Sequence, residues 1–204
     1  MSKVNTNKTA VIFKLTLLSL FIAIMLVMNF TPIGYITTGL FSITLMTIPV
    51  ALGGACTGPA GGTVLGAVFG LTSFLQAFGI GFMIDPMAAN LFTENPFGYT
   101  VTCFLPRLIV GFASGFVFWL FKRSDKVGIP AFMLSAAIVP LLNTILFMTF
   151  YALFYRNTVL GGTSVMAVVF SAFTINFVVE LIVTLVAGTF INKAIYHYAK
   201  RYMN

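Results

Sequence analysis

Apolar residues form six long stretches in this chain, separated by short segments that hold most of its charged residues. A helix needs about 20 apolar residues to cross the hydrocarbon core of a bilayer, and these stretches approach or exceed that length. The pattern therefore predicts an all-α membrane protein, a bundle of six transmembrane helices. The expected spans are residues 10–30, 39–56, 60–80, 99–121, 129–155 and 165–192.

The composition supports this interpretation. Hydrophobic residues make up 59% of the 204 residues and charged residues 7%, which lies far outside the range of soluble globular domains. Tails and loops use up what the spans leave, so we expect a single transmembrane domain over residues 1–204. The first span is longer than the apolar core of a signal peptide and has no small-residue cleavage site, so we expect it to be retained as a helix.

The basic residues set the expected orientation. The net charge is +7, and nine of the eleven Lys and Arg residues would lie on one side of a six-span bundle. Arg156 would lie in a loop on the other side, and Arg107 is inside a span. By the positive-inside rule, both termini are expected in the cytoplasm of a cell-membrane protein. Basic residues that flank spans also argue against nucleic-acid binding. The nine are Lys3, Lys8, Lys14, Lys122, Arg123, Lys126, Lys193, Lys200 and Arg201.

Polar residues at membrane depth are the main candidates for function. Arg107 in the fourth span lies ~12 Å, and Asn143 in the fifth ~18 Å, from the outer end of its span, at ~1.5 Å per residue. Asn176 and Glu180 in the sixth span lie ~16 and ~22 Å deep. Thr184 continues the same helical face at four-residue spacing. Three helices would thus bring a cation, an anion and two amides to overlapping depths.

These residues allow two interpretations. An ionisable group inside the bilayer costs ~2.5–3.5 kcal/mol on insertion scales, so it normally faces a cavity or a partner, which favours ligand binding. Alternatively, Arg107 and Glu180 form a buried ion pair that locks two spans together, with the two asparagines as interhelical hydrogen-bonding groups. Both interpretations hold if the pair opens to admit a ligand.

Two longer outer loops are expected, at 30–38 and 81–98. Asp85-Pro86 and Asn95-Pro96 are turn signals in the second loop. Polar residues of such a loop are more often plain solvated positions, but a loop of that length in so compact a chain still suggests a lid. The candidate gating residues are Tyr35, Asp85, Asn90 and Glu94.

Small residues form stripes on two spans. The third span carries Gly58, Gly62, Gly66 and Gly70 at four-residue spacing. For this stripe we favour close helix packing over a functional role. A smaller stripe in the first span is open to both internal packing and docking of another membrane protein; it consists of Thr16, Ser19 and Ala23.

The sequence offers nothing for catalysis. The one histidine, His197, is in the C-terminal tail. There is no zinc-protease, Walker or serine-hydrolase motif and no metal-ligand cluster. We therefore expect neither an enzyme nor a resident cofactor. Transport driven by ATP would need a partner that supplies the ATPase.

The chain resembles the substrate-binding S components of energy-coupling factor (ECF) vitamin transporters, especially their pantothenate-type members. The resemblance combines size and topology with two segments. One is the glycine-rich run Leu52-Gly53-Gly54-Ala55-Cys56-Thr57-Gly58-Pro59-Ala60-Gly61-Gly62, and the other is Leu105-Pro106-Arg107-Leu108-Ile109-Val110-Gly111.

The resemblance implies a vitamin-binding subunit whose ligand, pantothenate in the members it most resembles, lies near the outer side among the last three spans and under the two outer loops. Arg107 would fix a carboxylate by a charge-assisted contact, and Glu180 would accept from a hydroxyl or hold Arg107. The asparagines would bond hydroxyl or amide groups, and Phe104 and Phe173 would wall the apolar part.

The resemblance also implies partners, namely a membrane T component bound to two ATPase subunits. In the family, an alanine-x-x-x-alanine pattern of the first span contacts the T component, and here the pattern is Ser19-x-x-x-Ala23. The loaded subunit would then topple in the bilayer. Two other classes stay open: an autonomous secondary transporter or channel, which should show inverted repeats or a continuous polar path, and a structural membrane subunit.

Overall fold

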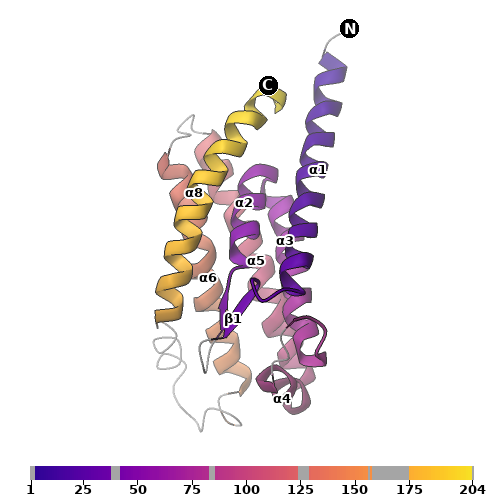
Figure 1. Ribbon diagram of the computed structural model, residues 1–204, viewed down its shortest axis with the longest axis vertical. Coiled ribbons are helices and arrows are strands. Elements are labelled where there is room, and N and C mark those ends of the chain that lie inside the picture. The colour runs from indigo at the N-terminus through magenta and orange to yellow at the C-terminus, as the bar shows by residue number, and fades with distance from the viewer. Residues whose placement is uncertain are drawn as a thin grey trace.

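The computed structural model describes residues 3–37, 42–82, 86–123, 129–155, 157 and 175–203, and within them the fold is a bundle of helices (Figure 1). The long axis is followed by α1 (Lys3–Asn29), α2 (Thr47–Thr57), α3 (Pro59–Leu75), α5 (Pro96–Arg123), α6 (Ile129–Tyr155) and α8 (Ile175–Met203). Short elements connect them: β1 (Tyr35–Thr37), β2 (Ser42–Thr44), η1 (Gln76–Phe78) and α4 (Pro86–Glu94).

The helices have the length and composition of a membrane protein. Among the described residues, four segments are long and apolar enough to cross a bilayer: Lys8–Asn29, Pro59–Phe78, Pro96–Phe121 and Pro130–Tyr155. Thr47–Thr57 and Phe177–Ile191 are shorter apolar helices. Large apolar side chains such as Val27 and Phe190 point outward, as expected for surfaces that face lipid. The prediction of an α-helical membrane protein is confirmed.

The expected second span was placed too early. Residues of the 39–56 segment form β2, which pairs antiparallel with β1 so that Tyr35 lies opposite Thr44, and the helix begins only at Thr47. Isoleucine and threonine in this stretch favour extended backbone. Pro49 falls in the first turn of α2, where its missing N–H is tolerated. The proline therefore marks the start of the helix and does not interrupt it.

The expected loop at 81–98 was also wrong over most of its described length. Residues 86–94 form α4, and α5 begins at Pro96. Both prolines that we interpreted as turn signals occupy the first position of a helix, which suits their fixed φ angle. Asn95 caps α5, because its Oδ1 accepts a hydrogen bond from the backbone N–H of Gly98 at 2.9 Å.

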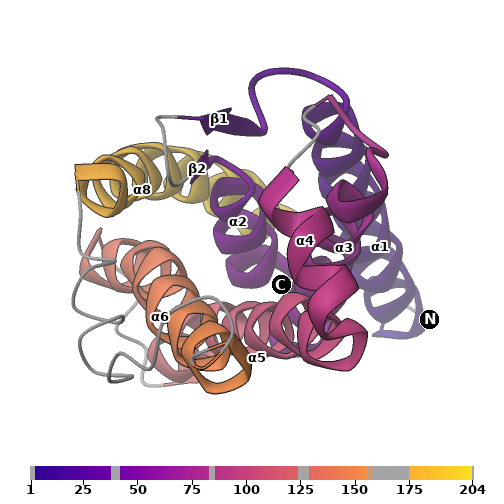
Figure 2. The ribbon, with the colours of Figure 1, turned by 90° about the horizontal axis from the view of Figure 1, so that it is seen from below.

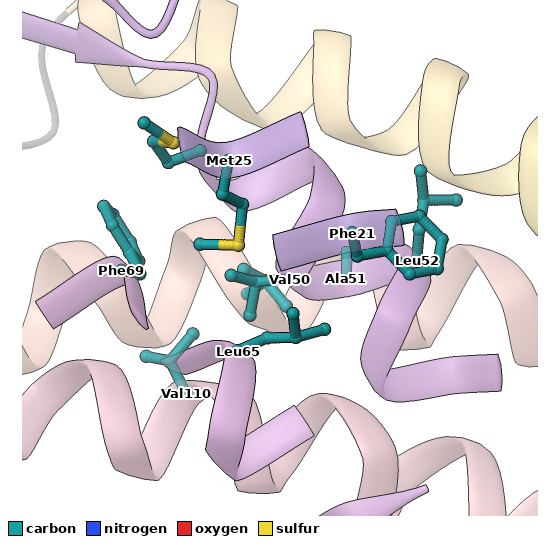
Figure 3. Close-up of a cluster of buried hydrophobic side chains, with 10 residues drawn as sticks. Phe21, Met25, Val50, Ala51, Leu52, Leu65, Phe69 and Val110 are labelled. Carbon is teal, nitrogen blue, oxygen red and sulfur yellow. The ribbon is translucent and has the colours of Figure 1, made fainter. Parts of the chain in front are cut away.

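The ends of the bundle differ. Both chain termini lie at one end, whereas the β1–β2 hairpin and α4 lie at the other (Figure 1). Seen from the hairpin end, α2 is surrounded by the other helices (Figure 2), and it contacts α1, α3, α5, α6 and α8. The core is built on α2. Its buried apolar side chains include Phe21, Met25, Val50, Leu65 and Val110 (Figure 3).

The glycine stripe of α3 packs directly on α5. A Cβ atom on Gly62 would overlap the carbonyl oxygen of Gly111, and one on Gly66 would overlap the carbonyl oxygen of Arg107. The favoured interpretation of close helix packing is therefore confirmed. Because the two backbones touch at Gly66 and Arg107, this packing also fixes the height of Arg107 in the bundle.

Candidate functional site

Three helices contribute buried polar side chains to the interior. Arg107 of α5, Asn143 of α6 and Glu180 of α8 are 7%, 7% and 5% exposed. Burial of an ionisable group in a membrane bundle requires compensating contacts, so the surroundings of each group indicate what it can do.

Arg107 is held by its own helix. Its Nη1 donates a hydrogen bond to the carbonyl oxygen of Thr102 at 2.6 Å. In a regular helix that carbonyl would accept from the N–H of residue 106, but Pro106 has no N–H. The proline thus frees a carbonyl oxygen and the next side chain uses it. Sequence analysis named Pro106 only as part of the run Leu105–Gly111 that carries the family resemblance, and assigned it no role.

Two aromatic rings complete the contacts of Arg107. Its Cζ lies 5.3 Å from the ring centroid of Phe69 on α3 and 4.6 Å from that of Phe147 on α6. Asn143 precedes Phe147 by four residues, so it lies on the same face of α6. Phe147 and Phe69 were missed by sequence analysis; only the spacing between Asn143 and Phe147 could have indicated the former.

Glu180 lies on the other side of the site. Its carboxyl group is next to the hydroxyl of Thr47 and the backbone of Thr44, and it is within electrostatic range of Arg107. Thr47 also shares a 3.2 Å hydrogen bond with Thr184, one turn along α8 from Glu180. The start of α2 therefore supplies the Thr47 hydroxyl to the site, which the expected transmembrane assignment of this segment did not indicate.

Several hydrogen-bonding groups of the site have no partner within the described part of the chain. They are Nε of Arg107, Oδ1 of Asn143 and Oε1 of Glu180, all buried. No ion pair joins Arg107 to Glu180 among the described residues. A buried polar group without a hydrogen bond costs ~1–3 kcal/mol. Such a concentration of unsatisfied donors and acceptors suits the binding of a polar ligand.

The β1–β2 hairpin lies over this site. The hydroxyl of Tyr35 shares hydrogen bonds with the side chains of Thr72 (3.4 Å) and Ser73 (3.3 Å) on α3, and Tyr35 is within electrostatic range of Arg107. The backbone N–H of Leu45 donates to the carbonyl of Gly34 at 3.0 Å. Tyr35 therefore tethers the hairpin to the bundle next to the buried arginine.

Helix α4 forms a second cover beside the hairpin. Asn90 and Glu94 are exposed on its outer side, and Leu91 is buried on its inner side. Phe104 lies beneath α4, with its ring centroid 5.9 Å from that of Phe74, in a cluster that also holds Phe92 and Tyr99. The structure thus places Phe104 in the packing under α4, whereas the described rings next to Arg107 are those of Phe69 and Phe147.

The remaining candidates divide into two groups. Thr16, Ser19 and Ala23 are exposed on α1, and the hydroxyl of Thr16 donates to the carbonyl of Ile12 in its own helix. Their face therefore packs against no other part of the described chain. Asp85 and Phe173 lie outside the described residues, and of Asn176 only the backbone, within α8, is described.

These features define a class of protein: a small membrane-embedded receptor with a buried polar site beneath two short covering elements. The family description "ECF transporter, substrate-specific component" matches residues 13–188. The chain belongs to this family, as its sequence resemblance predicted, and is a multi-pass protein of the plasma membrane. The chain is also 31% identical over 150 residues to the pantothenic acid transporter PanT of Lactococcus lactis subsp. cremoris (strain MG1363), an alignment that covers 70% of this chain and 74% of that protein.

The tether of the hairpin can be tested without a ligand. Tyr35→Phe removes the hydroxyl that bonds α3, and a hydrogen bond of this kind contributes ~1 kcal/mol, so amide exchange in the hairpin should speed up about fivefold. Hydrogen–deuterium exchange with mass spectrometry would measure it. As a matched control, Tyr155→Phe removes the hydroxyl that donates to the carbonyls of Leu91 and Asn95 and should affect α4. Equal exchange in wild type and Tyr35→Phe would show that the hydroxyl is not a tether.

Proposed function

We propose that this chain is the high-affinity substrate-binding subunit of an ATP-driven ECF importer that takes up pantothenate. The observation that carries the proposal is a buried arginine whose Nε has no partner among the described residues, in a chain similar to a pantothenic acid transporter. Pantothenate has a carboxylate, an amide and two hydroxyl groups. These groups can hydrogen-bond to the guanidinium group of Arg107, the side-chain amides of Asn143 and Asn176 and the carboxyl group of Glu180.

Each polar residue has a proposed role. Arg107 pairs with the carboxylate through a charge-assisted hydrogen bond. Asn143 and Asn176 bond the amide or the hydroxyl groups, and Glu180 accepts from a hydroxyl. Phe104 and Phe173 wall the apolar part of the ligand; for Phe104 this requires a shift away from its place under α4.

The proposed topology is a single domain over residues 1–204 with six spans and cytoplasmic termini. Nine basic residues on the terminal side support it. With both chain ends at one end of the bundle and the hairpin and α4 at the other (Figure 1), the covering elements would face outward. Ligand would then enter from outside, and the two covers would close over it. Tyr35, Asp85, Asn90 and Glu94 are the proposed gating residues.

The proposed partners are a membrane T component and two ATPase subunits, with no catalytic role for this chain itself. The exposed face of Thr16, Ser19 and Ala23 is the proposed docking surface for the T component. Its small side chains would let a partner helix approach closely.

The ligand's charge is tested by comparing two substitutions. Arg107→Ala should weaken pantothenate binding by ~2–5 kcal/mol, much of it from leaving the ligand carboxylate buried without its partner. Glu180→Gln should weaken it less. Isothermal titration of the purified subunit measures both. A cationic or pyrimidine-like ligand would reverse this ranking.

A third variant separates binding from structure. If the double Arg107→Met/Glu180→Met variant binds pantothenate as well as wild type, the two residues serve only the bundle and the proposed site is wrong. Thermal melts of all three variants show whether lost binding reflects lost folding.

The docking surface is tested by adding bulk to it. Ser19→Trp or Ala23→Trp should abolish ATP-dependent uptake in liposomes that contain the ECF partners, while pantothenate binding by the isolated subunit survives. The matched control is Ile24→Trp, which lies ~100° around the helix from Ala23 and is also exposed. Uptake that survives the two stripe substitutions would place the docking surface elsewhere.

A further inference from the structure

The contacts of Arg107 determine which part of its guanidinium group a ligand can reach. The two rings that approach Cζ come from α3 and α6, the helices that flank α5 when the bundle is seen from the hairpin end (Figure 2). A guanidinium carbon that lies over the face of a ring is typical of stacking, and a stacked guanidinium group keeps its edge for hydrogen bonds. Nη1 at one part of this edge is already used by the carbonyl of Thr102. The part that carries Nε has no acceptor in the described chain.

Both rings are themselves fixed in place. Phe69 is fully buried and belongs to the core cluster around α2 that Figure 3 shows. Phe147 stacks on Tyr151, with centroids 6.2 Å apart and an interplanar angle of 11°. Tyr151 lies 5.6 Å from Tyr155, whose hydroxyl donates to the carbonyl of Leu91 in α4. A continuous row of rings on α6 therefore runs from α4 to the arginine.

The carbonyl that holds Nη1 is equally fixed. It is available because Pro106 cannot donate to it, and the height of α5 is set by the contact of Gly66 with the backbone of Arg107. Two rings and one carbonyl thus constrain the orientation of a side chain that otherwise rotates freely. The nitrogen left over is Nε, and together with Nη2 it forms an edge that matches the two oxygens of a carboxylate.

We propose that Phe69, Phe147 and Pro106 are positioning residues that aim the Nε edge of Arg107 at the ligand, so that the site selects a planar carboxylate bound in the plane of the guanidinium group. This inference rests on the proposed function and deepens it. None of the three residues needs to touch the ligand. Their effect is on the discrimination between a carboxylate and a neutral group of similar size at the same position.

Two probes isolate that discrimination: pantothenate, and pantothenol, in which an alcohol replaces the carboxylate. Phe147→Leu should weaken pantothenate binding about tenfold, an effect of the size expected for losing one desolvated ring contact with the cation. Pantothenol affinity should change by less than about twofold, because a neutral alcohol gains little from an oriented cation. Phe147→Tyr keeps the ring and should restore selectivity. The matched control is Phe112→Leu on α5. This phenylalanine is exposed and stacks on Phe116, so its replacement should change neither affinity.

Pro106→Ala provides an independent readout. It adds an N–H that competes with Arg107 for the carbonyl of Thr102 and removes a proline from a helix interior. The melting temperature should therefore stay the same or rise, while selectivity for pantothenate over pantothenol falls. If Pro106 had only a structural role, its replacement would change the melting temperature without lowering the selectivity for pantothenate over pantothenol.

The outcomes are distinct. Equal loss of affinity for both probes in Phe147→Leu, or unchanged selectivity in both Phe147→Leu and Pro106→Ala, would overturn the positioning role. If wild type binds neither probe by isothermal titration, the proposed function itself fails, and that result is recognised before any variant is compared.

Discussion

The guanidinium group of Arg107 must be held inside an apolar bundle without its hydration shell, and this requirement organises the polar interior. Inserting such a group costs ~2.5–3.5 kcal/mol. One charged hydrogen bond contributes ~1.5–3 kcal/mol, and each cation–π contact ~0.5–2 kcal/mol. The carbonyl of Thr102 and the rings of Phe69 and Phe147 therefore supply compensation of the same size as the cost. Within the described part of the chain the arginine is compensated without a carboxylate partner, which leaves Glu180 for other hydrogen bonds.

The helix packing serves this arrangement. Glycines on α3 and α5 bring the two backbones into contact, which fixes the position of Arg107 relative to α3. The hairpin and α4 then cover the site from one end of the bundle. Each is joined to the helices by a tyrosine hydroxyl, Tyr35 to α3 and Tyr155 to the end of α4. The helix α4 also packs on the apolar cluster that holds Leu91, Phe92 and Tyr99, so the hairpin should open at lower cost than α4.

Sequence reasoning predicted the helical membrane bundle, the family and the burial of Arg107, Asn143 and Glu180, because long apolar stretches and rare charges within them are strong signals. It misplaced the second helix and replaced α4 by a loop. Both errors involve prolines, whose meaning depends on position. Pro86 and Pro96 begin helices and Pro49 lies in the first turn of one, and before a fold is known each could equally end a helix. The rings around Arg107 could not be predicted. Phenylalanine is abundant throughout the chain, and only the way the helices pack identifies Phe69 and Phe147 as the two rings next to Arg107.

The account depends on a small carboxylate being the natural ligand of this site. The most direct measurement is mass spectrometry of small molecules extracted from the purified protein, isolated from cells grown with pantothenate in the medium. The account predicts pantothenate near one equivalent in wild type and its absence from protein that carries Arg107→Ala. A cationic compound in wild type, or pantothenate retained equally by both proteins, would contradict it.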